Sequence, residues 1–337
     1  MKVIVNHPAQ DIPESMRRDL AKVGPISWFG INSFEERCTG SLTRLGETDL
    51  NIQSVYFLEY PTSARPESED RRLRRVHREY VADLASRSSA ALTSYSVEAY
   101  ASDGLISALT KFIDAHPASA LVLDISCFTK IHVVAAAECI RAMGPTRRPI
   151  FAVYTSPRAY GNLDQTSKVI GWSDVIVAPI SNSAQMRNES HSRGIIIAGH
   201  ESERLWSALN EIEPAAGLVA LGNTPGRPDI TRLSERVNKK IMSHIALDYD
   251  SAWHRKVVDI ADVEEMRLRV SLEVALAKPH SSPVILYPFG PKTLILASAL
   301  ALLDLYPEAS WFVYPVPAGY DVSYSEGIGG TYWFLID

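Results

Sequence analysis

Two segments of this chain each lead a short strand into a helix: VLDISCFTK (Val122 to Lys130) and ILYPFGPK (Ile285 to Lys292). In both, apolar strand-forming residues run into a polar turn, and a lysine stands where an apolar helical pattern begins. A strand followed at once by a helix is the repeating unit of α/β proteins with parallel sheets. Two such segments in one chain therefore predict two α/β units.

Short β-rich runs alternate with longer helical patterns on both sides of these segments, which is typical of a mostly parallel sheet. In the first half we expect strands at Ile26–Ile31, Val55–Tyr60, Leu92–Val97, Ala120–Ile125 and Ile150–Tyr154, and helices at Ser33–Leu45, Glu67–Ser86, Asp103–His116 and Thr129–Met143. In the second half we expect strands at Gly194–Ala198, Gly217–Leu221, Lys256–Ile260, Val284–Tyr287 and Trp311–Tyr314, and helices at Ser202–Ile212, Ile230–Ile245, Val263–Ala277 and Pro291–Leu305. The predicted fold class is α/β, with tandem Rossmann-like units at residues 1–190 and 191–337.

Particular residues recur in the same order in the two halves, which predicts an internal duplication. Besides the two lysine segments, GINSFEER (Gly30 to Arg37) corresponds to AGHESER (Ala198 to Arg204) at the start of a helix. Further on, YTSPRAY (Tyr154 to Tyr160) corresponds to YPVPAGY (Tyr314 to Tyr320) after a strand. The turns themselves differ, so we expect the two sites to have diverged.

The composition is that of an ordinary globular protein, with 46% apolar and 22% charged residues. A formal charge of −5 argues against a protein that mainly coats nucleic acid, although a local basic patch remains open. Three cysteines without a CxxC pair suggest no disulfide framework, the N-terminus lacks the apolar core of a signal peptide, and no apolar run is long enough for a membrane span. We expect a cytoplasmic protein with no membrane association.

Ligands of an open parallel sheet bind beyond the carboxyl ends of its strands, where helix N-termini present free N–H groups. A lysine opposes the helix dipole at that end, so Lys130 and Lys292 suggest a bound anion such as phosphate. Pairing with a carboxylate such as Asp124, or a surface position, is the alternative. The candidate ligand-binding residues are Asn32, Ser33, Arg37, Asp124, Ser126, Thr129, Lys130, His200, Arg204, Gly290, Lys292 and Tyr320.

Arg37 and Arg204 stand at the starts of their helices, where an arginine can reach a phosphate bidentately or clamp the loop of the other half across an interface. Tyr320 could stack on a base or pack within its loop. If the protein is an enzyme, the candidate catalytic residues are glutamates as general base and tyrosines as acid. They are Glu36, Glu203, Tyr160 and Tyr320.

The remaining motifs are weaker. The helical segment Glu67 to Tyr80 contains five arginines, which usually means a solvated face but also suits a partner or nucleic acid. Histidine spacing predicts no metal site, and the chain lacks GxxxxGK[ST] and a placed GxGxxG. We therefore expect no cofactor.

A Rossmann-like unit with the pattern strand-D-x-S-x-x-x-K-helix, duplicated in one chain, resembles the CARF and SAVED sensor domains of prokaryotic antiviral systems. In those families two Rossmann-like units form a composite pocket for a cyclic oligonucleotide, and the lysine-bearing helix start contacts it. Asp124, Ser126 and Lys130 match the pattern. The second half departs from it, with Tyr287 in place of the aspartate and Pro291 before the lysine.

This resemblance implies a protein that binds a nucleotide or other phosphorylated ligand between its two halves. It would act as a sensor or regulatory subunit in prokaryotic antiviral defence, through a protein partner or self-assembly. A second hypothesis is an enzyme that processes a nucleotide or phosphoester in the same cleft. A third is a structural subunit of a multiprotein defence complex, and nucleic acid remains an open partner.

Overall fold

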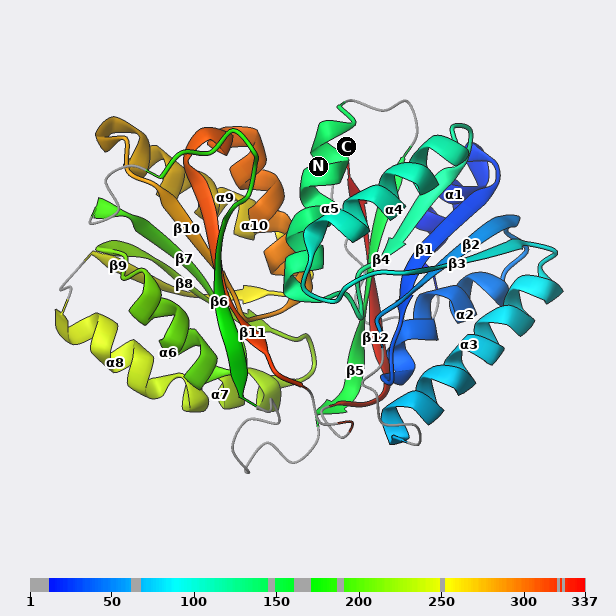
Figure 1. Cartoon of the computed structure of the whole chain (residues 1–337), viewed down its shortest axis with the longest axis horizontal. Helices are drawn as coiled ribbons and strands as arrows, with labels where there is room; N and C mark the ends of the chain where they lie inside the picture. Colours follow the sequence, from blue (N-terminus) through cyan, green and yellow to red (C-terminus); the bar gives the residue numbers. More distant parts are fainter. Residues whose placement is uncertain are drawn as a thin grey trace. The chain divides into compact units, whose positions relative to one another are not determined.

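The computed structural model of the protein describes residues 12–61, 68–144, 149–160, 171–186, 191–248, 252–319, 322 and 325–336. It contains two six-stranded, mostly parallel sheets with interleaved helices (Figure 1), which confirms the predicted α/β class of two Rossmann-like units. Each sheet belongs to one compact unit. The first unit comprises Met1–His132, Met143–Asn162 and Val322–Asp337, and the second comprises Val133–Ala142 and Leu163–Asp321.

The first sheet has the strand order β12-β5-β4-β1-β2-β3, in which all neighbours except β12 and β5 are parallel. Its strands are β1 (Ile26–Asn32), β2 (Ile52–Glu59), β3 (Ala91–Ser96), β4 (Ala120–Asp124), β5 (Ile150–Tyr160) and β12 (Ser325–Ile336). The helices interleaved with them are α1 (Glu14–Val23), η1 (Glu36–Thr39), α2 (Gly40–Gly46), α3 (Glu69–Arg87), α4 (Ser102–Ala115) and α5 (Lys130–Ala142).

The second sheet repeats this order as β6-β11-β10-β7-β8-β9, with β6 and β11 antiparallel. Its strands are β6 (Trp172–Pro179), β7 (Arg193–Ala198), β8 (Ala216–Asn223), β9 (Trp253–Asp259), β10 (Val284–Pro288) and β11 (Ser310–Pro317). Its helices are α6 (Ser202–Glu211), α7 (Pro228–Val237), α8 (Lys239–Asp248), α9 (Val263–Ala277), η3 (Lys278–His280), α10 (Lys292–Leu305) and η4 (Pro307–Ala309). The shared order fits the predicted duplication.

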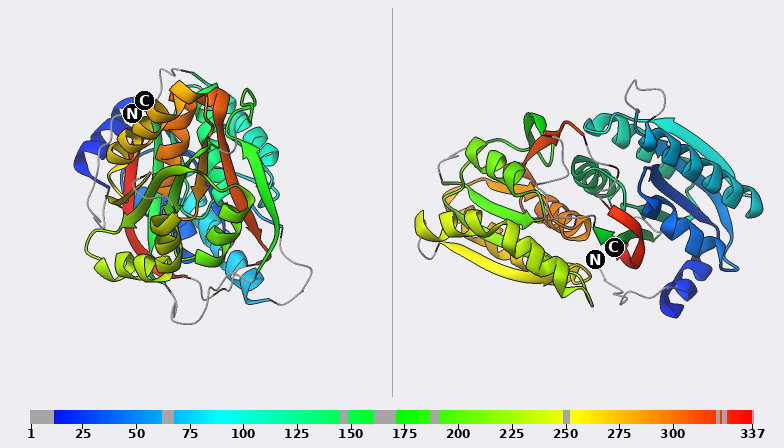
Figure 2. Two further views of the ribbon diagram at one scale, coloured as in Figure 1. Left: turned by 90° about the vertical axis from the view of Figure 1, so that its left-hand side faces the viewer. Right: turned by 90° about the horizontal axis from the view of Figure 1, so that it is seen from below.

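The two sheets exchange their antiparallel strands. β6 follows β5 along the chain but pairs with β11, and the two strands run side by side in Figure 2 as well. β12 follows β11 and pairs with β5. The predicted boundary at residue 190 divides the chain into two consecutive stretches of sequence. The sheets do not follow that division throughout, because the first sheet includes β12, which comes after β11, and the second includes β6, which comes directly after β5.

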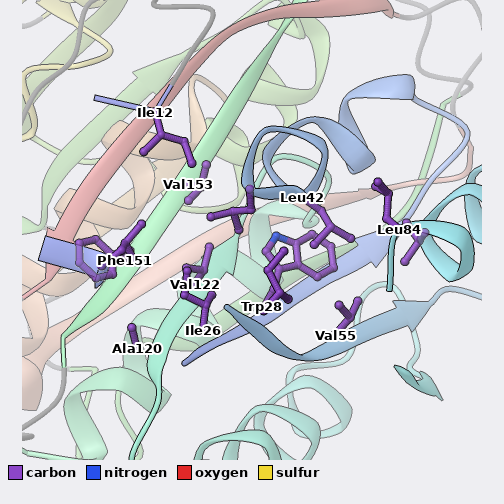
Figure 3. Packing of buried hydrophobic residues seen from close by; sticks show 14 of the residues in the cluster. Ile12, Ile26, Trp28, Leu42, Val55, Leu84, Ala120, Val122, Phe151 and Val153 are labelled. Carbon is purple, nitrogen blue, oxygen red and sulfur yellow. The ribbon is translucent and has the colours of Figure 1, made fainter. Parts of the chain in front are cut away.

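Alternation along β1 distributes large side chains to both faces of the first sheet. Trp28 joins a buried cluster that includes Leu42 of α2 and Leu84 of α3 (Figure 3), so these helices cover one face. Phe29, the next residue, contacts Phe112 of α4 at 5.1 Å between ring centroids, so α4 covers the other face. This packing fixes the carboxyl ends of the strands, where the candidate residues lie.

Two of the predicted helices differ from the sequence-based expectations. The predicted helix at Ser33–Leu45 is the short η1 followed by α2, and the predicted helix at Ile230–Ile245 is divided into α7 and α8. Asn238 separates those two helices, and its side-chain amide donates to the carbonyls of Gly199 and Ser234. Within the described ranges, no helix has the length and apolar character needed to cross a membrane.

Candidate functional site

Arg37 lies in η1, just beyond the carboxyl end of β1, and is almost fully buried. Its Nε and Nη2 donate to the two carboxylate oxygens of Glu35 at 3.0 and 3.1 Å, and its guanidinium lies 5.9 Å from the ring centroid of Tyr154. Burial alone lowers the pKa of Arg37, but its neighbours, Glu35 first among them, raise that pKa well above its ordinary value. The charged Arg37 therefore ties the loop after β1 to β5 within the first unit.

Arg204 has an equivalent arrangement in the second unit. It is buried at the start of α6, pairs with Glu201, and donates from Nε to the carbonyl of Pro315 at 3.1 Å. Its guanidinium lies 4.7 Å from the ring centroid of Tyr314, the counterpart of Tyr154 in the duplicated sequence. In both units the arginine holds a loop of its own unit, which is neither a phosphate contact nor a clamp on the other half.

Asp124 and Ser126 are buried inside the first unit and bonded to neighbours on three elements. Asp124 accepts from the Ser126 N–H at 2.8 Å and from the Ser41 hydroxyl. Ser126 Oγ accepts from the Thr155 N–H at 2.7 Å. Burial raises the pKa of Asp124, and hydrogen bonds from Ser126 and Ser41 oppose that rise. These bonds hold the turn after β4 against α2 and β5.

Thr129 and Lys130 begin α5 beside a buried tyrosine–histidine pair. The hydroxyl of Tyr60 lies 2.7 Å from His132 Nδ1 and accepts from the Thr129 N–H at 3.1 Å. His132 Nε2 donates to the carbonyl of Ala101 at 3.0 Å. The Nδ1 atom of the neutral ring therefore carries no proton and accepts the hydrogen bond from the Tyr60 hydroxyl. Burial lowers the pKa of His132 to about 4 and raises the pKa of Tyr60 well above its usual range. The network joins the carboxyl end of β2 to the starts of α4 and α5. Lys130 is half-buried and has an interaction partner of its own.

The second-unit candidates are placed as follows. His200 lies half-buried just after β7, and Lys292 is a buried first residue of α10; both have interaction partners. A Cβ added to Gly290 would lie 2.6 Å from Ile197 Cγ2 and 2.8 Å from the carbonyl oxygen of Ala198. Gly290 is therefore required for the close approach of its loop to the end of β7.

The catalytic candidates that the structure describes lie at exposed or half-buried positions. Glu36 and Glu203 are exposed first-turn residues, and Tyr160 is half-buried at the end of β5. Tyr320 lies outside the described residues. No group of three or more His, Cys, Asp or Glu in the described part of the chain is arranged to hold a metal ion. A catalytic role for these residues stays a prediction.

A hollow of about 710 Å³ opens at the carboxyl ends of β1, β2 and β3, and we call it the arginine pocket. Its volume falls in the range of roughly 300–1,000 Å³ that is typical of small-molecule sites. All of its lining residues belong to the first unit. They are Asn32, Glu59, Tyr60, Pro61, Ser68, Glu69, Arg71, Arg72, Arg74, Arg75, Arg78 and Ser96.

The local sequence explains why α3 presents arginines to this pocket. Ser68 caps the helix by accepting from the Arg71 N–H, and Glu69 and Asp70 follow in the first turn. Further along, His77, Val81 and Leu84 recur at helical spacing and are buried against the core. The same periodicity leaves the arginines of the first turns on another face, at the sheet edge.

The pocket has a positive balance of charge. Five arginines line it against two carboxylates, Glu59 and Glu69, which pair with Arg78 and Arg72. Arg74 is engaged in the structure: its Nε donates to Asp70 at 2.6 Å and its Nη1 to the carbonyl of Asn32 at 2.9 Å. A concave surface with this excess of guanidinium groups favours anions.

Two predicted residues help to form this pocket or its surroundings. Asn32, the last residue of β1, donates from Nδ2 to the carbonyl of Arg74 at 3.1 Å, and its buried Oδ1 has no hydrogen-bond partner among the described residues. Ser33 is buried behind the pocket, where its Oγ accepts from the Glu35 N–H at 3.2 Å. The sequence singled out the arginine-rich segment only as a charged helix face. The signal that could have located it is its position directly after β2, at the ligand-binding edge.

These features define a tandem Rossmann-like α/β protein with an arginine-lined hollow at one sheet edge. No protein-family model matches the chain, and no curated protein matches it either. Among solved structures, one of the most similar is a type III CRISPR defence DNA nuclease activated by cyclic oligoadenylate. The identity is 9% and the TM-score 0.48, over 86% of this chain and 65% of the nuclease, so the chain spans less than two thirds of that protein. A protein described as a universal stress protein, from Pseudomonas aeruginosa UCBPP-PA14, matches with 8% identity and a TM-score of 0.23, over 86% of this chain and 93% of that one. Likenesses of this size identify no family.

Proposed function

We propose that this protein binds a nucleotide or another phosphorylated ligand as a sensor or regulatory subunit, and that the arginine pocket is its anion-binding site. The observation that carries the proposal is the gathering of five arginines where three neighbouring parallel strands end. In open α/β sheets, this edge is where ligands bind.

Guanidinium groups suit this role because they remain charged and present paired donors to phosphate oxygens. The N-terminus of α3 adds free N–H groups and a partial positive charge at the same place. A hydrogen bond to a charged group contributes about 1.5–3 kcal/mol.

The proposed setting is prokaryotic antiviral defence, motivated by the resemblance of Asp124, Ser126 and Lys130 to the CARF and SAVED pattern. In this proposal, occupation of the pocket changes how the protein meets a partner or assembles with itself. Lys130 begins α5 next to Thr129, whose N–H is bonded to the pocket residue Tyr60. That bond gives α5 a direct connection to the pocket wall.

Two measurements test the anion site. Mass spectrometry of small molecules released from freshly purified protein would identify a bound nucleotide, and calorimetry would measure binding of a panel of mononucleotides and of linear and cyclic oligonucleotides. We expect at least one phosphorylated compound to bind. In the double variant Arg71→Ala/Arg75→Ala, its affinity should fall by at least about tenfold, which corresponds to about 1.4 kcal/mol.

Arg87→Ala is the matched control. Arg87 lies in the last turn of the same helix, is exposed, pairs with Asp83, and does not line the pocket. Arg87→Ala also removes a positive charge from α3, but it does so outside the pocket. Binding should therefore stay within about twofold of the native value. The proposal would be wrong if no phosphorylated compound binds, or if the double variant binds as tightly as the control.

A further inference from the structure

The pocket arginines form a stripe along α3. Arg71, Arg75 and Arg78 follow one another at spacings of four and three residues, so they share one face of the helix. At 1.5 Å per residue, the stripe extends over about 10 Å of helix axis. A row of this length is longer than one phosphate group needs.

The charge balance of the pocket also fits a phosphate-bearing anion. Even when Asp70, the partner of Arg74, is counted with the two lining carboxylates, five arginines face three acidic groups. Glu59 and Glu69 lie in the wall itself, and their pairing with arginines limits their repulsion of an anion. The net positive charge of two matches one doubly charged terminal phosphate or two singly charged phosphodiester groups, so the length of the stripe is what argues for more than one phosphate.

Among the described lining residues, Tyr60 is the one side chain with an aromatic ring on which a base could stack. Apart from Tyr60 and Pro61, the described lining residues are charged or carry a hydroxyl or amide group. The Tyr60 hydroxyl is already bonded to His132 and to the Thr129 N–H. Proteins that bind bases usually stack them on aromatic rings, and a site for several bases usually contains several such rings.

We infer that the pocket selects its ligand by a run of at least two successive phosphate groups, and not by the identity of the base. This inference rests on the proposed function and names the ligand chemistry of the same site. Two sources supply that chemistry: the tail of a nucleoside di- or triphosphate, and the backbone of a short single-stranded oligonucleotide.

Calorimetry with a graded panel tests the inference on the full chain. The probes are orthophosphate, pyrophosphate and tripolyphosphate, the four nucleoside triphosphates, and four single-base tetranucleotides. Affinity should rise at least about tenfold from orthophosphate to tripolyphosphate, and the four triphosphates should agree within about threefold. Tighter binding of the triphosphates than of the tetranucleotides would assign the source to the nucleotide tail, and the reverse would assign it to the backbone.

Variants separate recognition from folding. Arg71→Ala/Arg75→Ala should remove the advantage of tripolyphosphate over orthophosphate, whereas Arg75→Lys keeps the charge and should retain most of it. Arg87→Ala should behave as the native protein, and thermal melts would show that each variant is folded. A preference of more than about tenfold for one base, or equal affinity for orthophosphate and tripolyphosphate, would overturn the inference while leaving the proposed function standing. Failure of the whole panel would overturn both.

Discussion

Acidification should destabilise the first unit through His132, because this histidine is buried as a neutral ring. Above about pH 6.5, His132 is neutral in both the folded and the unfolded chain. Below that pH, the unfolded chain takes up a proton, while the folded chain resists until the pKa of about 4 is reached. Each tenfold difference in proton affinity corresponds to about 1.4 kcal/mol, so the loss of stability approaches about 3 kcal/mol near pH 4.

The test is the difference between two proteins, because other groups also titrate in this range. Urea-dependent hydrogen exchange of peptides from β1 and β4 would give the free energy of unfolding of the first unit at pH 7 and pH 4.5. His132→Gln keeps a donor and an acceptor without a titrating ring, so it should lose about 2–3 kcal/mol less than the native protein between these values. His254→Gln, at an exposed position in β9, should match the native protein. Equal losses in the native protein and His132→Gln would refute the reasoning.

Two further predictions concern the second unit. Arg204→Met should cost about 3–5 kcal/mol of unfolding free energy, because it leaves the buried Glu201 without a counter-charge. The double variant with Glu201→Gln should recover part of this in urea unfolding, and a loss below about 1 kcal/mol for the single variant would contradict the ion-pair argument. Gly290→Ala should cost about 1–3 kcal/mol, because its Cβ would press on Ile197 Cγ2 and the Ala198 carbonyl. An unchanged melting temperature would show that this loop can relax.

The sequence predicted the parallel part of both sheets because that part depends on local patterns. All ten parallel strands lie where apolar β-rich runs were expected, from Ile26–Asn32 to Ser310–Pro317. It missed α1 and the antiparallel strands β6 and β12. The segment Ser325–Ile336 forms a strand with a bulge between Ile328 and Thr331, and it pairs with β5. The partner of such a strand lies far away in the chain, and alternation along one segment does not reveal it.

The candidate site was predicted less well because residue spacing fixes an edge of the sheet but not the direction of a side chain. Arg37 was expected either to reach a phosphate or to clamp a loop of the other half, and instead it pairs with Glu35, two residues earlier in its own unit. Asp124 matched a sensor pattern, yet its oxygens accept from Ser126 and Ser41 inside the unit. Asn32 lines the arginine pocket. Its position at the end of a predicted strand was the signal that made it a candidate. The arginines of α3 were interpreted as a solvated face or as a surface for a partner or nucleic acid, because helical periodicity alone cannot show a hollow.

The duplicated units have diverged most clearly at the edge where the arginine pocket lies. In the first unit, β2 ends at Glu59, and the arginine pocket lies between this end and the start of α3. In the second, Thr231 of α7 donates to Asn223 at the end of β8 at 3.0 Å. Pro291 packs so closely on β8 that a Cβ at Gly222 would lie 2.4 Å from its ring. Side chains therefore fill the corresponding edge of the second sheet. The two units share their strand order, and the first of them has the arginine-lined hollow at this edge.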